Sequence, residues 1–125
     1  MKHRQQCSGR FLQLRGIVVI TNEEVEQALD YLRDQAEKDA QARANAIYLA
    51  EWVRTERARL TVAQAGISNA AAVAIAESHP EYLRALNAYK AAVSEDYRRR
   101  FLREAAGAKI EAWRSMRANE RAQRI

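Results

Sequence analysis

Arginine is the residue type whose spacing in this chain most clearly suggests a chemistry. From Arg100 onward the arginines recur at alternating steps of three and four, interrupted only by Gly107 and Ile110. A helix brings residues at such steps to one side, where they would form a stripe roughly 36 Å long. The stripe consists of Arg100, Arg103, Arg114, Arg117, Arg121 and Arg124. A row of guanidinium groups favours an acidic partner, including nucleic acid.

A second group of arginines is harder to explain by pairing within the chain. Acidic residues in the first turns of a preceding helix, such as Glu23 and Asp30, could neutralise the last arginines of the stripe. The middle arginines face alanines and another arginine in the predicted arrangement, so we expect them to be uncompensated. This central arginine cluster contains Arg43, Arg98, Arg99, Arg100 and Arg103. We predict it as the main binding site and the C-terminal part of the stripe as a secondary one.

The predicted contacts are with the backbone of single-stranded DNA, because nothing in the chain resembles a module that reads base edges. Tyr97 and Phe101 flank the central cluster; they could stack on bases, although core packing is the plainer interpretation. The complete predicted set is Arg43, Arg98, Arg99, Arg100, Arg103, Lys109, Arg114, Arg117, Arg121 and Arg124.

Signals for catalysis are weak. The two histidines are His3, near the N-terminus, and His79, directly before the single proline. A histidine in that position is typical of a helix boundary. The chain contains no Glu-x-x-His pattern, no paired cysteines and no glycine-rich phosphate loop. We therefore expect a protein that is not an enzyme and that uses no metal and no cofactor.

Composition points to a single domain of long helices. The 125 residues include only one proline and four glycines, and the net charge is +5. The charge is uneven: residues 21–62 hold nine acids and six bases, whereas residues 80–125 hold six acids and eleven bases. Cys7 is the only cysteine, and the apolar runs are too short to cross a bilayer. A cytoplasmic protein is predicted.

The first 20 residues differ from the rest. Residues 1–15 contain four bases and no acids and have no periodicity, which indicates an irregular basic arm. An alternative is that residues 1–17 are not native protein. Arg15-Gly16 would then be a translated ribosome-binding site, and the natural start would be Val18 or Val19.

Residues 21–125 predict an all-α domain with three helices, at about 22–62, 69–78 and 80–120. Thr21 and Glu24 form a capping box at the first helix. Ser68 or Asn69 can cap the second, and Pro80 suits the first position of the third. The predicted inner face of the first helix is Val25, Leu29, Leu32, Ala36, Ala40, Ala46, Leu49, Val53 and Leu60. That of the third is Leu83, Leu86, Val93, Tyr97, Phe101, Ala105, Ala108 and Ala112.

Two long helices with a short connection predict an antiparallel, coiled-coil-like hairpin. In this register Trp113 would lie near Leu29 and Leu32. Gly107 would then reflect close helix packing. The hairpin has little interior of its own, so we expect oligomerisation to complete it. A compact three-helix monomer is the alternative.

The C-terminal half resembles a group of small helical proteins from the early regions of temperate phages and prophages. The resemblance covers about 40 residues. It rests on Tyr89 in Tyr-Lys-Ala-Ala, Arg98-Arg99-Arg100-Phe-Leu, Ala108-Lys-Ile-Glu-Ala-Trp-Arg-Ser115, Ala118-Asn119 and Arg121. Such proteins resemble accessory or mediator proteins of phage DNA replication and recombination, which bind single-stranded DNA or load a recombinase. This chain departs from many of them in Ala70–Ala76, where they carry a more charged segment.

Two functions are therefore expected from different classes. The first is a homo-oligomeric, non-enzymatic DNA-binding accessory protein, whose implied partners are single-stranded DNA, a recombinase or a single-strand-binding protein. The alternative is a helical adaptor or structural bundle component that binds an acidic protein.

Overall fold

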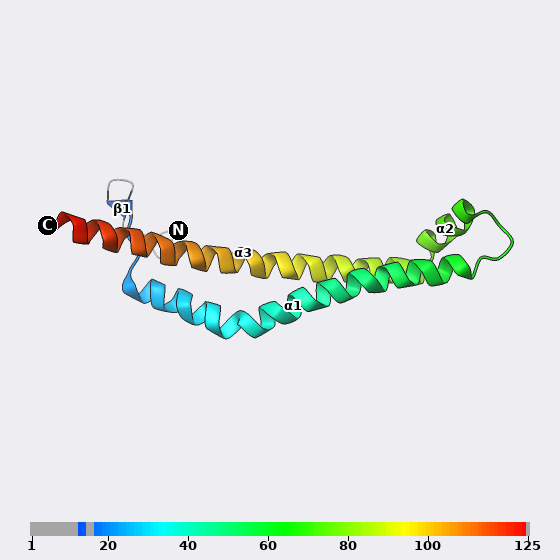
Figure 1. The fold of residues 1–125 in the computed structure, drawn as a ribbon, viewed down its shortest axis with the longest axis horizontal. Coiled ribbons are helices and arrows are strands. Elements are labelled where there is room, and N and C mark those ends of the chain that lie inside the picture. The colour runs from blue at the N-terminus through cyan, green and yellow to red at the C-terminus, as the bar shows by residue number, and fades with distance from the viewer. Residues whose placement is uncertain (1–12, 15–16, 125) are drawn as a thin grey trace, which may run out of the picture. The chain divides into compact units, whose positions relative to one another are not determined.

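The computed structural model describes residues 13–14 and 17–124, and it confirms the all-α class (Figure 1). The helices are α1 (Asn22–Val62), α2 (Asn69–Ser78) and α3 (Pro80–Gln123). The bounds of α1 and α2 coincide with the predicted ranges, and α3 runs three residues beyond residue 120. Strands β1 (Gln13–Leu14) and β2 (Ile17–Val18) form a two-residue antiparallel pair. The rest of the predicted basic arm, and so the alternative start, lies outside the described residues.

Each helix begins at a capping interaction. At α1, Thr21 Oγ1 accepts a hydrogen bond from the Glu24 amide at 3.2 Å, and Glu24 Oε2 accepts one from the Thr21 amide at 3.0 Å. This reciprocal pair is the predicted capping box. At α2, Ser68 Oγ accepts from the Ala71 amide at 3.2 Å. At α3, His79 Nδ1 accepts from the Glu81 amide at 3.1 Å. These bonds satisfy amides that have no partner within the helix.

The connection between α1 and α2 needs a glycine. Gly66 has a φ of 84°, a left-handed conformation that side chains with a Cβ rarely adopt. Gly107 is different, because a Cβ built there would meet no heavy atom within 4 Å among the described residues. The prediction that close packing requires this glycine is therefore wrong.

The chain divides into two compact units, although the sequence predicts one helical domain. The first unit takes Met1–Asp34 and Arg103–Ile125, which include the start of α1 and the end of α3. The second unit is Gln35–Leu102, with the rest of α1, all of α2 and the start of α3.

Three ion pairs connect the helices of the second unit. Arg43 Nη1 lies 3.3 Å from Asp96 Oδ2 and joins α1 to α3. Arg57 Nε lies 3.0 Å from Glu77 Oε1 and joins α1 to α2. Arg59 joins α1 to α3 again, because its Nη2 bonds to the carboxylate of Glu81. Helix α2 buries its alanines Ala72 and Ala76.

Buried and half-buried residues follow a heptad repeat along α1. Burial recurs at alternating steps of three and four residues, so that one side of the helix is covered throughout. The covered positions are Val25, Ala28, Leu32, Gln35, Asp39, Ala42, Ala46, Leu49, Val53, Glu56 and Leu60. The prediction was correct for Val25, Ala46 and Leu60, with Leu32, Leu49 and Val53 half-buried. It was wrong for Leu29, Ala36 and Ala40, which are exposed.

The predicted inner face of α3 is wrong. Its residues are exposed, except for the half-buried Val93. A heptad repeat of smaller and more polar residues takes the inner side instead. These residues are Tyr82, Ala85, Tyr89, Ala92, Asp96, Arg99, Arg103, Ala106, Ile110 and Trp113. The prediction gave weight to bulky apolar side chains, whereas contact with a neighbouring helix requires small residues that let the backbones approach.

The core is accordingly thin. Apart from Val25 and Leu60, the buried hydrophobic residues of the described chain are all alanines. None of its large side chains falls below 2% exposure. Many larger apolar side chains therefore remain at the surface of the described chain.

Candidate nucleic-acid interface

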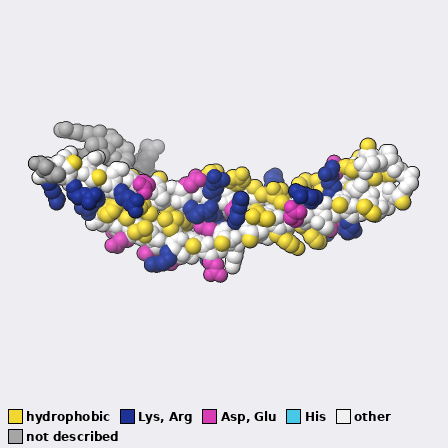
Figure 2. Space-filling view, viewed as in Figure 1, with side chains coloured by type: hydrophobic (Ala, Val, Ile, Leu, Met, Phe, Trp, Pro, Cys, Tyr) yellow, Lys and Arg dark blue, Asp and Glu magenta, His cyan; other side chains and the backbone are white. Residues whose placement is uncertain are grey.

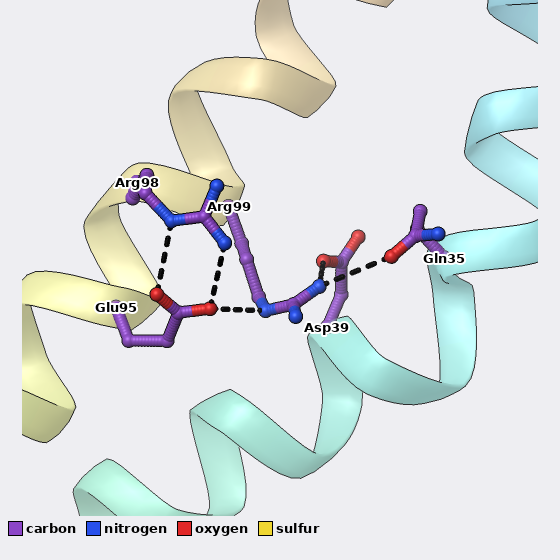
Figure 3. A network of polar contacts seen from close by, with 5 residues as sticks. All are labelled: Gln35, Asp39, Glu95, Arg98 and Arg99. Carbon is purple, nitrogen blue, oxygen red and sulfur yellow. Dashed lines mark hydrogen bonds and ion pairs between the residues drawn. The ribbon is translucent and has the colours of Figure 1, made fainter.

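The central arginine cluster contains a guanidinium group that is buried between helices of the second unit. The Arg99 side chain is only 17% exposed, because Arg99 lies on the inner side of α3. Its Nη1 atom lies 3.4 Å from Asp39 Oδ1 and donates to Gln35 Oε1 at 3.3 Å (Figure 3). Its Nε atom donates to Glu95 Oε1 at 2.8 Å. The charge of Arg99 is thus shared between two carboxylates of the same chain.

Glu95 binds a second arginine as well. Arg98 donates to both Glu95 oxygens, from Nε at 2.9 Å and from Nη2 at 2.8 Å (Figure 3). The hydrogen bonds from Arg98, with a further one from Arg99, lower the pKa of Glu95 from 4.5 to about 2. The carboxylate therefore stays ionised well into the acidic range.

The remaining members of the cluster also have partners. Arg43 is paired with Asp96, as described above, and neither Arg100 nor Arg103 is without an interaction. The prediction of an uncompensated cluster is therefore wrong. The physical reason is that Asp39 and Asp96 occupy inner heptad positions, where the predicted register placed only alanines. Charges held in this way would have to exchange one partner for another before they could bind phosphate.

The C-terminal arginine face, which we define as Lys109, Arg114, Arg117, Arg121 and Arg124, lies in the first unit. The four arginines line a shallow groove together with Trp113, Ala118 and Glu120. Figure 2 shows Lys and Arg side chains gathered along the end of α3 that carries the C-terminus. This groove is the most basic surface feature of the unit.

Trp113 and Arg117 are held in place by a residue of α1. Asn22 Oδ1 accepts hydrogen bonds from Trp113 Nε1 at 2.9 Å and from Arg117 Nη2 at 2.8 Å. The Arg117 guanidinium also lies 5.4 Å from the centre of the Trp113 ring, which is a cation–π arrangement. The predicted contact of Trp113 with Leu29 and Leu32 is thus displaced by about two helical turns toward the start of α1.

The other cations of the face are weakly compensated. Arg114 Nη1 lies 3.3 Å from Glu111 Oε1, and both side chains are about 70% exposed. Arg117 also pairs with Glu120 at 3.4 Å. Among the described residues, no ion pair involves Lys109, Arg121 or Arg124. The acids of α1 do not neutralise this face; Asp30 and Asp34 pair with Arg33 instead. Exposed pairs of this kind are worth about 0–1 kcal/mol and can be exchanged for phosphate contacts.

The structure thus separates the predicted binding residues into two groups. Arg43, Arg98 and Arg99 are engaged with carboxylates of the second unit, whereas Lys109 and the last four arginines remain accessible in the first. Sequence reasoning missed Asn22, which fixes the aromatic ring beside the groove. A short polar residue directly after the capping threonine gave no signal for that contact.

Comparison with protein-family models, with curated proteins and with solved structures finds no match to this chain. Within residues 13–14 and 17–124, no helix combines the length and the apolar character needed to span a membrane. The same residues contain no group of three or more histidine, cysteine or acidic side chains placed to hold a metal ion.

Proposed function

We propose that this chain is a non-enzymatic helical protein that binds the backbone of single-stranded DNA through its C-terminal arginine face. The observation that carries the proposal is the groove lined by Arg114, Arg117, Arg121 and Arg124 beside Trp113. Cations along a shallow groove can follow a phosphate backbone, and an aromatic ring beside them can stack on a base. The resemblance to phage proteins supports a role as an accessory factor of replication or recombination, with a recombinase or single-strand-binding protein as a further partner.

The proposal includes an antiparallel pairing of α1 and α3. In the second unit, α1 residues that come later in the chain contact α3 residues that come earlier, from Asp39 with Arg99 to Arg59 with Glu81. This order is the one that an antiparallel hairpin produces. The heptad pattern of burial on both helices supports coiled-coil-like packing.

The alternative function is a helical adaptor or bundle component that binds an acidic protein. The exposed apolar side chains of α3, including Tyr97 and Phe101, support it because surfaces of this kind mark protein contacts. An acidic peptide would use the same arginines, but it would not need an aromatic stacking surface. The two functions therefore predict different ligands for one face.

The test is binding of a fluorescent oligo(dT) by anisotropy, with a poly-glutamate competitor as the second ligand. In the site variant, Arg114, Arg121 and Arg124 are replaced by alanine, while Arg117 is kept because it holds Trp113. The control variant Lys38→Ala/Arg54→Ala/Arg84→Ala removes the same charge from exposed positions elsewhere. We expect the site variant to bind about tenfold more weakly or worse, and the control to change by about twofold or less.

A fluorescence measurement adds a local readout. Trp52→Phe leaves Trp113 as the only tryptophan, and its emission should be quenched when oligo(dT) binds. Equal losses in both triple variants would show that only net charge matters. Binding of poly-glutamate without binding of oligo(dT) would support the adaptor.

A further inference from the structure

Helix α3 carries a second heptad repeat on its outer side, within the second unit. Leu83, Leu86, Lys90, Val93 and Tyr97 follow one another at steps of three and four. Leu83, Leu86 and Tyr97 are 44%, 39% and 49% exposed. A helix that is apolar on two sides is typical of bundles in which it contacts more than one neighbour.

Phe101 extends this repeat by one further turn. Its ring is stacked on Tyr97 with a centroid distance of 6.1 Å, and it is 62% exposed. We call Leu83, Leu86, Val93, Tyr97 and Phe101 the outer stripe. None of its members is acidic, and Lys90 is the one charge at a heptad position within it.

Helix α1 adds apolar surface next to the outer stripe. Arg43 reaches Asp96, the neighbour of Tyr97, which places that side of α1 beside the stripe. Ile47 is one turn further along the same side and is 56% exposed. Ala36, Ala40 and Ala44 are also exposed on α1. Figure 2 shows hydrophobic side chains reaching the surface along this part of the molecule.

The exposed area is large for a single small protein. Aromatic side chains have areas of about 150–250 Å², so Tyr97 and Phe101 together expose roughly 200 Å². Leu83, Leu86 and Ile47 add roughly 100–150 Å². A standard interface uses about 800 Å² per partner, of which somewhat more than half is apolar. These five side chains supply most of that apolar share, and the neighbouring alanines and Val93 supply the remainder.

We propose that the outer stripe binds the outer stripe of a second copy of this chain, with the two α3 helices antiparallel about a two-fold axis near Val93. This alignment places Leu86 opposite the partner's Phe101. It also places Lys90 opposite the partner's Tyr97, where the ammonium group meets a ring face. A lysine at one heptad position fixes register and partner number at some cost in stability.

The stripe therefore matches itself in shape and in charge, which favours a second copy over a partner of another kind. The inference names the surface for the oligomer predicted above and does not depend on nucleic-acid binding. Its tests are accordingly made without DNA, so that either proposal can fail alone.

The first test is the molar mass of the full chain in solution over an about hundredfold range of concentration. Leu86→Glu/Phe101→Glu puts like charges into the interface and should lower the mass to that of a monomer. Tyr48→Glu/Trp52→Glu makes the same charge change at exposed apolar residues of α1 outside the stripe and should leave the mass unchanged. Circular dichroism checks that both variants remain helical.

The second test places a thiol at the proposed axis. In a Cys7→Ser background, Val93→Cys should form a disulfide-linked dimer on mild oxidation, because the two thiols would lie close together. Ala91→Cys, exposed on another side of α3, should not. A monomeric wild-type chain at all concentrations would overturn the proposal. So would a dimer that survives the stripe variant, or one that crosslinks equally at both positions.

Discussion

At the residue scale, Glu95 shows how a charged cluster can be internally compensated. Its two oxygens accept three hydrogen bonds from Arg98 and Arg99. A sequence that reads Arg98-Arg99-Arg100 suggests a free cationic site, yet carboxylates three and four residues earlier on a helix are close enough to bind it. The arginine run alone therefore cannot distinguish a ligand site from a network within the chain.

The lowered pKa of Glu95 gives a pH prediction. Its pKa lies at about 2 in the folded chain, against an ordinary value of 4.5, mainly because Arg98 donates hydrogen bonds to the ionised form. The resulting stabilisation is complete above the ordinary value and is lost as the pH falls from about 4.5 toward 2. The free energy of unfolding of Glu95→Gln should therefore depend less on pH in this window than that of the wild type.

The direct measurement is the carbon-13 chemical shift of the Glu95 carboxylate during an acid titration. Arg98→Ala removes two of the three hydrogen bonds, so it should move the midpoint upward. A midpoint that stays the same in Arg98→Ala would mean that Arg98 does not cause the shift.

At the element scale, the sequence predicted the helices well and their contacts poorly. Helix ends depend on local chemistry, such as the Thr21 and Glu24 capping box, which can be read from a few neighbouring residues. The inner side of α3 depends on what the neighbouring helix allows. Two heptad repeats overlap on α3, and the repeat with the larger apolar residues is the exposed one. Hydrophobicity alone therefore selected the wrong side.

The same reasoning explains the misplaced binding site. Asp39 and Arg99 occupy inner positions that a hydrophobic pattern assigns to apolar residues, so their pairing could not be predicted from periodicity. Only a register accurate to one heptad position would have brought them together. The C-terminal arginine face was easier to predict, because its residues are accessible whichever inner face is chosen.

The buried pair of Asp39 and Arg99 leads to a stability prediction. Arg99→Leu removes the cation and leaves the Asp39 carboxylate, 7% exposed, in the interhelical contact. Removal of one partner of a buried pair typically costs about 3–5 kcal/mol, and we expect the lower end because Asp39 has a further interaction. Asp39→Leu/Arg99→Leu should recover most of the loss, because packed leucines need no counter-charge.

Urea unfolding followed by circular dichroism measures these differences. Arg98→Leu is the matched control, because the adjacent Arg98 side chain is 57% exposed and its loss should cost about 1 kcal/mol or less. If Arg99→Leu were no more destabilising than Arg98→Leu, the burial of Arg99 would have no energetic consequence.

At the scale of the whole molecule, charge and apolar surface belong to different units. The C-terminal arginine face is part of the first unit, and the outer stripe is part of the second. The uneven charge of the sequence predicted the first of these surfaces. The second followed only from the burial of the described residues, which showed that the bulky apolar residues of α3 have no partner helix within the unit.

The two surfaces should respond to salt in opposite ways, which gives the last prediction. Single-stranded DNA binding that neutralises about four phosphates should show a log–log salt slope near −3, at about −0.7 per phosphate. Contact between outer stripes is mainly apolar, so salt should leave the mass of the dimer unchanged or stabilise it slightly. The experiment compares oligo(dT) affinity and molar mass from about 50 mM to about 200 mM salt. DNA affinity that does not change with salt would contradict the arginine face as the DNA site, whereas a dimer that dissociates along the same slope would indicate that arginines, rather than the outer stripe, hold the two copies together.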